Sequence, residues 1–178
     1  MKATETLRHE HDIILLVLDA AENEATRQGA CDRQRVSQMV DFFRGFVDKC
    51  HHAKEEGYLF PTLVERGLPL EEGPIAVMLD EHEEGRGHVR AIAAALEQAE
   101  EDNEDAIAEH LAAFVDLLRA HIGKENNVLF PLADQLLGES DQQFLTAEFE
   151  RVEREEIGEG VHERYHELAH ELAGARAH

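Results

Sequence analysis

The segment HHAKEEGYLFP at residues 51–61 returns seventy positions later as HIGKENNVLFP at residues 121–131. Six of the eleven positions are identical, and they include the first His and the Glu four residues after it. On an α-helix, side chains four residues apart share one face, about one turn or ~6 Å apart along the axis. Each copy therefore presents a His–Glu pair that can bind a metal ion, and two copies can bind two ions.

The repeat extends upstream of each copy. Glu10-His11 lies 40 residues before His51, and Glu81-His82 lies 39 residues before His121. The repeated unit is therefore Glu-His, a long interval, and then His-x-x-Lys-Glu-x-x-x-Leu-Phe-Pro. A helical hairpin used twice about a pseudo-twofold axis would bring the two units together.

The spacing of apolar residues predicts an all-α protein. Helices are expected from Thr4 or Thr6 to before Gly29, from a cap at Asp32 to about residue 60, from about Pro74 to about residue 100, and from residue 107 to near 138. In each helix a repeat His occupies a position of the apolar stripe, which faces the core, where polar groups must be paired or bound to metal. The two Leu-Phe-Pro tails are expected to pack and to end or bend their helices.

The bulk composition limits the class of function. The chain has 178 residues, enough for one domain, and its 39 acidic against 17 basic residues give a formal net charge of -22. Such a surface disfavours nucleic acid and membrane surfaces as partners, although adaptation to salt would also account for the charge. The chain has only two cysteines, and its sequence contains no apolar signal region and no apolar run long enough to span a membrane. These features favour the cytoplasm as the location of the protein.

Together the two units offer four imidazoles and two carboxylates, namely His11, His51, His82, His121, Glu55 and Glu125. Each of two metals would take two His nitrogens, and the two Glu would bridge between the metals. A hydroxo or oxo group from water would complete the bridge and leave an open position on each metal. Mixed nitrogen and oxygen ligation suits Fe, Mn, Co or Zn better than Mg or Ca, and the sequence does not identify the metal.

These motifs resemble the hemerythrin-like proteins of the HHE cation-binding family, over roughly residues 1–138. The resemblance rests on both Glu-His pairs, both His-x3-Glu pairs and both Lys-Glu-x3-Leu-Phe-Pro tails. It implies an up-down four-helix bundle around a non-haem diiron centre, with two oxo- or hydroxo-bridged iron ions held by the six residues. It also implies dioxygen, peroxide or nitric oxide as the small partner, with Mn or Zn as other possible metals.

The sequence departs from the oxygen-carrying hemerythrins at two positions. Their third helix has His-x3-His where this chain has Arg86, and their fourth has His-x4-Asp where this chain has His121-x3-Glu125. The pattern is similar to bacterial relatives and to the hemerythrin domain of the F-box iron sensor. It disfavours reversible oxygen carriage and favours reaction or sensing, with peroxide- or oxygen-reactive diiron activity as one possibility. The alternative is a non-enzymatic iron or oxygen sensor, or a metal-storage bundle, acting through a protein partner.

Several neighbours of the six residues carry weaker expectations. Gly85 leaves room for a small ligand, and Arg86 is expected to pair with a bridging Glu or to line the entrance. Tyr58 is interpreted as core packing in preference to an extra ligand. His52 and His88 fall off the metal face of a regular helix, so they are expected in solvent or behind the ligands.

Residues 139–178 lie outside the repeat and are predicted to be an acidic helical extension, interrupted near residues 157–160. This segment is expected to pack on the bundle or to serve self-association, as in a homodimer. Its row of His162, His166 and His170 is interpreted as a solvated helix face in preference to a second metal site. Cys50 is expected to be structural in preference to redox-active.

Overall fold

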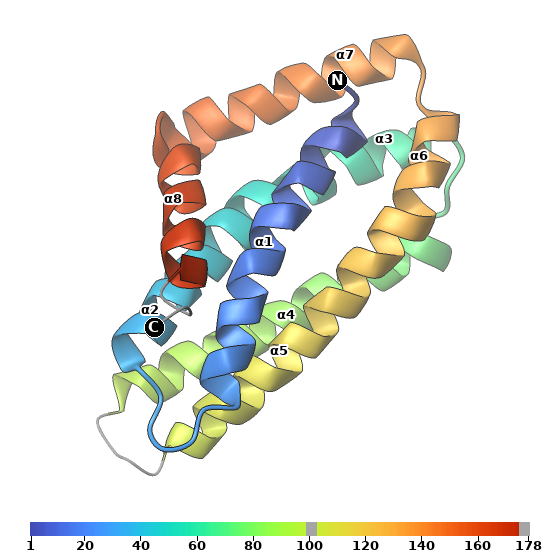
Figure 1. Cartoon of the computed structure of the whole chain (residues 1–178). Coiled ribbons are helices and arrows are strands. Elements are labelled where there is room, and N and C mark those ends of the chain that lie inside the picture. The colour runs from blue at the N-terminus through green and yellow to red at the C-terminus, as the bar shows by residue number, and fades with distance from the viewer. Residues whose placement is uncertain (99–102, 175–178) are drawn as a thin grey trace.

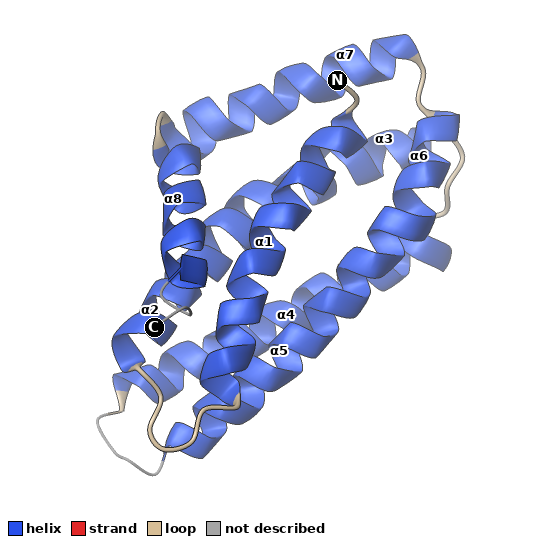
Figure 2. Cartoon of the chain, in the orientation of Figure 1, coloured by secondary structure: helices blue, strands red, loops and turns tan. Residues whose placement is uncertain are grey.

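The structure is a computed structural model that describes residues 1–98 and 103–174. Helices make up nearly all of this described part, which contains no strand, and the predicted all-α class is confirmed (Figure 2). Long helices run side by side as a bundle, and the C-terminal helices close one end and one side of it (Figure 1). No helix in the described ranges is long and apolar enough to cross a membrane.

The bundle consists of two helical hairpins, as the repeat predicts. The first hairpin pairs α1 (Ala3–Ala25) with a continuous helix made of α2 (Arg33–Phe42), η1 (Phe43–His52), η2 (Glu55–Leu59) and α3 (Phe60–Glu65). The second pairs α4 (Gly73–Glu97) with α5 (Glu104–Lys124), η4 (Glu125–Leu129) and α6 (Phe130–Leu136). The Asp32 carboxylate accepts a hydrogen bond from the Arg35 N–H at 3.2 Å, so it caps α2 as expected.

The two Leu-Phe-Pro tails do not end their helices, contrary to expectation. Both helices continue through the proline, one to Glu65 and the other to Leu136. Just before each proline the helix widens into a π-turn, in which the Phe60 N–H donates to the carbonyl of Glu55 and the Phe130 N–H to that of Glu125. A helical proline lacks an N–H and its ring clashes with the carbonyl four residues earlier, and a widened turn relieves this clash.

The hydrophobic core is divided by a polar layer. One apolar cluster gathers residues such as Ile14, Val47 and Val89, and the other gathers residues such as Leu7 and Leu59. On each of the four long helices, the repeat His lies between a residue of one cluster and a residue of the other. The two clusters therefore fix the helices on both sides of the layer and hold its polar side chains in place.

The C-terminal extension consists of α7 (Glu139–Arg151), η5 (Val152–Gly158) and α8 (Val161–Gly174). Gly158 and Gly160 adopt positive φ values of 116° and 81°, so the chain turns sharply at the interruption expected there. Helix α8 then packs on α1, and its Ala169 and Leu172 join the core (Figure 1). Self-association and the domain boundary at residue 138 stay predictions.

Candidate metal centre

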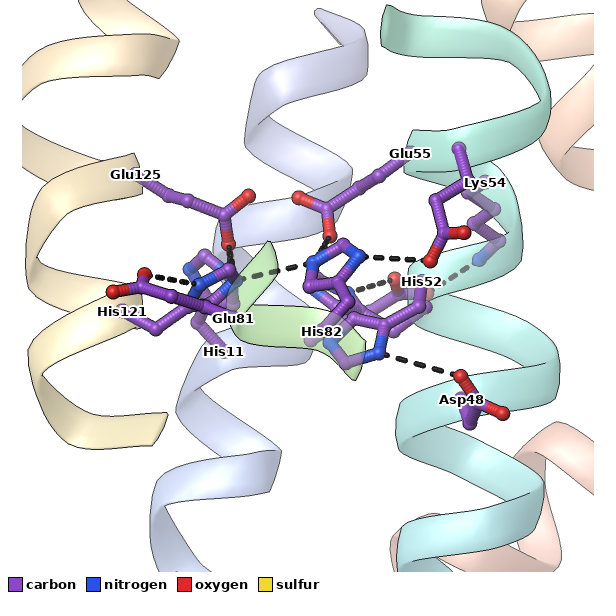
Figure 3. A network of polar contacts seen from close by, with 12 residues as sticks. His11, Asp48, His52, Lys54, Glu55, Glu81, His82, His121 and Glu125 are labelled. Carbon is purple, nitrogen blue, oxygen red and sulfur yellow. Dashed lines mark hydrogen bonds and ion pairs between the residues drawn. The ribbon is translucent and has the colours of Figure 1, made fainter. Parts of the chain in front are cut away.

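The six predicted metal ligands meet in the polar layer, and each is at most 1% exposed. They come from all four long helices: His11, His51, Glu55, His82, His121 and Glu125. Figure 3 shows the carboxylates of Glu55 and Glu125 turned toward one another beside the histidine rings. The structure thus brings all six side chains together, and their role as ligands stays a prediction.

Each carboxylate lies between one histidine of each repeat. The Glu125 Oε1 atom is 3.2 Å from Nε2 of His11 and 3.2 Å from Nε2 of His121. The Glu55 Oε1 atom is 3.5 Å from Nε2 of His51 and 3.4 Å from Nε2 of His82. In each carboxylate the same oxygen, Oε1, thus lies between a histidine of the first repeat and a histidine of the second.

The histidines themselves form two pairs. The rings of His11 and His51 have centroids 4.8 Å apart, and those of His82 and His121 are also 4.8 Å apart. The donor atoms of His11, His51, Glu55 and Glu125 lie within 4.8 Å of one another, and so do those of His52, Glu55, His82 and His121. The arrangement therefore offers two adjacent positions for a metal ion, one in each half of the layer.

The outer nitrogen of every histidine is fixed by a polar partner. The Nδ1 contacts are His51 to Glu10 at 2.9 Å, His121 to Glu81 at 3.0 Å, His82 to Glu56 at 2.8 Å and His11 to Asn126 at 2.8 Å. A carboxylate or amide on one ring nitrogen aims the other nitrogen inward, as is usual for metal-bound histidine. The repeat contained Glu10 and Glu81, whereas the partners Glu56 and Asn126 were not identified from the sequence.

Three of the four carboxylate oxygens at the centre lack a hydrogen-bond partner among the described residues, whereas Oε1 of Glu125 lies 3.2 Å from Nε2 of His11. Both oxygens of Glu55 and Oε2 of Glu125 are buried without a hydrogen-bond partner among the described residues. Burial and the nearby Glu125 carboxylate raise the pKa of Glu55 well above its ordinary value. Because a buried charge without a partner is costly, these oxygens are suited to contact a cation.

The imidazoles are suited to the same task. Burial lowers the pKa of His51 to about 4, against the opposing effect of Glu10, and burial likewise lowers the pKa of His82. Both rings are therefore neutral at pH 7 and keep a lone pair for a metal. Buried nitrogen and oxygen donors with unsatisfied oxygens fit a pair of transition-metal ions.

His52 lies closer to the centre than predicted. It is 4% exposed, its ring stacks on His82 with centroids 3.6 Å apart, and its Nδ1 is 3.5 Å from Asp48. The prediction that His52 lies in solvent is therefore wrong. The alternative prediction, that His52 lies behind the ligands, agrees with its stacking on His82. A regular helix would place His52 ~100° around the axis from His51, and the π-helical η1 changes that angle.

A cavity of about 120 Å³ adjoins the layer between η1 and α4, with α5 forming part of its wall. Its wall includes His52, Glu81, Gly85, Arg86 and Phe114. Arg86 donates to Asp48 at 2.8 Å and also contacts Glu56, so it lines this entrance and does not pair with Glu55 or Glu125. Gly85 also lies in the cavity wall, and its predicted role of leaving room for a small ligand stays a prediction.

Two further expectations concern side chains beside the repeat. Tyr58 turns toward the extension, where it contacts Arg151 and its ring meets Phe144 with centroids 6.4 Å apart. Tyr58 therefore packs against α7 and does not reach the centre. Cys50 is free and buried, and burial raises its pKa to about 12, which suits a structural role.

The histidine row of α8 is not a solvated face, contrary to expectation. The His162 Nε2 atom is 3.4 Å from Glu10, and the His166 ring packs edge-on against Phe46, whereas His170 is exposed. The spacing of these histidines in the sequence could not predict the contacts, because the contacts depend on how the extension packs on the bundle. His162 thus reaches the carboxylate that orients His51.

Comparison with known proteins gives one family match and several distant relatives. A family model described as the hemerythrin HHE cation binding domain matches residues 2–133. Uncharacterised proteins of Mycobacterium tuberculosis and Mycobacterium bovis are 24% identical over 163 residues, which cover 88% of this chain and 63% of theirs. The chain thus spans less than two thirds of the length of these relatives. No solved structure matches the chain significantly.

Proposed function

The chain belongs to the hemerythrin HHE cation-binding domain family, and from this premise we propose that it holds two iron ions in its polar layer. We propose further that this centre binds, senses or reacts with dioxygen, peroxide or nitric oxide. The observation that carries the proposal is the convergence of four buried imidazoles on two buried carboxylates, three of whose four oxygens lack a hydrogen-bond partner among the described residues. Manganese or zinc would suit the same donors.

Each side chain has a definite part in this proposal. His11 and His51 would hold one ion, His82 and His121 the other, and the two carboxylates would span them. Iron, when bound, would supply open coordination positions and electrons for a small oxidant. The outer partners Glu10, Glu81, Glu56 and Asn126 keep the rings aimed at the centre and strengthen them as ligands.

The surroundings restrict access to the proposed centre. The ring of Phe130 stacks on His11 at 5.4 Å between centroids, and that of Phe60 stacks on His82 at 6.0 Å. These rings keep water from one side of the layer, so a small ligand would enter by the cavity beside Arg86. The two free thiols and the use of ferrous iron suit a reducing cytoplasm as the proposed location.

Anaerobic reconstitution tests this function. Purified protein is loaded with ferrous iron, its iron content is measured, and then oxygen, peroxide or nitric oxide is added while the visible spectrum is followed. We expect two irons per chain, charge-transfer absorption of a coupled diferric pair after oxidation, and no such pair in Glu55→Ala. The proposal is contradicted if the protein does not bind two irons per chain. It is also contradicted if the two bound irons react with neither oxygen, peroxide nor nitric oxide.

A sensing role without catalysis is the second candidate, supported by the contact between His162 of the extension and Glu10. A change at the centre would reach α8 through this contact. Hydrogen exchange of residues 139–174 is compared in metal-free, ferrous and oxidised protein. Sensing predicts that exchange in η5 and α8 depends on the metal state, and identical exchange in all three states contradicts it.

A further inference from the structure

The two repeats use the same device to orient one histidine of each half. In the first, Glu10 accepts from Nδ1 of His51 and from the ammonium of Lys54. In the second, Glu81 accepts from Nδ1 of His121 and from the ammonium of Lys124. The sequences of the two halves therefore predict two equivalent metal positions.

The surroundings of these two devices differ. The side chains of Lys54 and Glu10 are 0% and 3% exposed, whereas those of Lys124 and Glu81 are 45% and 16% exposed. A charge-assisted hydrogen bond is strong when buried, but an exposed ion pair contributes little because water and salt screen it. His51 is therefore held more firmly than His121.

The C-terminal extension causes the difference. Glu153 of η5 accepts a hydrogen bond from Lys54 at 2.5 Å, and Nε2 of His162 in α8 lies 3.4 Å from Glu10 and 3.4 Å from Glu153. The Lys54 ammonium also lies 5.7 Å from the ring centroid of Phe149 in α7. The extension has no repeat partner, and the side chain of Lys124 is 45% exposed.

The cavity beside Arg86 adds an independent difference. Its wall includes Glu81, which orients His121, and His52, which stacks on His82. A polar depression on the other side is lined by Glu153 and His162, but its wall includes neither Glu10 nor Lys54. Of these two openings, the one beside Arg86 therefore leads toward the second half of the layer.

We propose that the extension makes the two metal positions unequal. The position between His11 and His51 is buttressed by Glu153 and His162 and retains its metal. The position between His82 and His121 exchanges its metal readily and receives small ligands through the cavity. This inference rests on the proposed dinuclear centre, and it makes Glu153 and His162 positioning residues for His51.

Metal release separates the two positions. Protein loaded anaerobically with two ferrous ions per chain is mixed with excess ferrozine, and the coloured complex is followed with time. We expect two phases of one iron each, with rates that differ at least tenfold, because loss of an outer partner typically weakens metal binding by about 10–100-fold. His82→Ala should retain only the slow phase, and His11→Ala only the fast one.

Variants of the extension test the cause. Glu153→Gln and His162→Gln should each accelerate the slow phase about tenfold and leave the fast phase unchanged. Glu155→Gln is the matched control, since this exposed residue of η5 contacts arginines and not Lys54, and it should change neither phase. Circular dichroism checks that the variants keep their helical content. If Glu153→Gln loses helical content, His162→Gln alone tests the cause.

The cavity is tested with azide as the small ligand. A side chain at Gly85 would begin 3.4 Å from Phe114, in ordinary contact, and would extend into the cavity. Gly85→Val should weaken azide binding to the diferric protein at least tenfold without changing the slow phase. Three results would overturn this inference. They are an unchanged azide affinity in Gly85→Val, a single phase of iron release in the parent protein, and equal acceleration of both phases by Glu153→Gln. Fewer than two irons per chain would overturn the proposed dinuclear function itself.

Discussion

The imidazole of His52 lies flat on that of His82, with centroids 3.6 Å apart and planes inclined by 18°. A nitrogen lone pair lies in the plane of its ring, so the lone pairs of two stacked rings point along parallel planes, and His52 would not share an ion that His82 holds. We predict that His52→Phe, which retains a stacked ring, keeps two metal ions per chain, whereas His82→Phe loses about one. Metal analysis of the purified variants measures this, and loss of an ion from His52→Phe would identify His52 as a ligand.

Glu55 is expected to destabilise the protein when no metal is present. Burial and Glu125 raise its pKa above the ordinary value of 4.5, so metal-free protein loses stability as the pH rises beyond that value. We predict that Glu55→Gln stabilises the metal-free protein at pH 8 by about 1 to 4 kcal/mol. This is the gain often found when a buried ion pair is replaced by hydrophobic residues of similar volume, and both changes remove buried charge. Urea unfolding with a chelator present measures the difference.

The neighbouring carboxylate supplies the control for this measurement. Glu56 is half-buried and hydrogen-bonded to His82 and Arg86, which lower its pKa against the opposing effect of burial. Glu56→Gln should therefore not stabilise the metal-free protein. If Glu55→Gln gives no gain, or if its gain shrinks as the pH rises from 5 to 8, the carboxylate at the centre is not the source of strain.

The helical pattern predicted the class of fold and the meeting of the six residues, because one stripe of a helix must face the core and each repeat His lies in such a stripe. The pattern missed the position of His52 because it assumes 3.6 residues per turn, and η1 is wider. It also missed the contact of His162 with Glu10 and that of Glu153 with Lys54. These contacts join residues 152 and 99 positions apart and depend on how the extension packs.

The π-turn at Glu125 is expected to depend on the proline that follows it. In Pro131→Ala the missing N–H returns and the clash with the carbonyl of Asn127 disappears, so the turn can close to a regular α-helix and rotate Glu125. We predict an affinity for ferrous iron about 10-fold lower, measured by anaerobic titration calorimetry. Pro74→Ala is the control, because Pro74 lies in the first turn of α4, where no carbonyl lies behind it, and it should leave the affinity unchanged. Unaltered affinity in Pro131→Ala would show that proline does not set this turn.

The extension is also joined to α3 by an ion pair whose strength depends on pH. Arg66 donates two hydrogen bonds to Asp141, at 2.8 and 2.6 Å, and the Gly138 N–H donates a third at 3.0 Å. The Arg66 guanidinium and the Gly138 N–H lower the pKa of Asp141 from 3.8 to about 2. Since the folded pKa is below the unfolded one, the stabilisation is complete above about pH 4 and is lost as the pH falls toward 2.

We predict that Asp141→Asn lowers the melting temperature by a few degrees at pH 7 and that the difference from the parent protein narrows below pH 4. Thermal unfolding of metal-free protein measures both, with the exposed Glu139→Gln as control. A difference that stays constant down to pH 3 would contradict the role of this carboxylate.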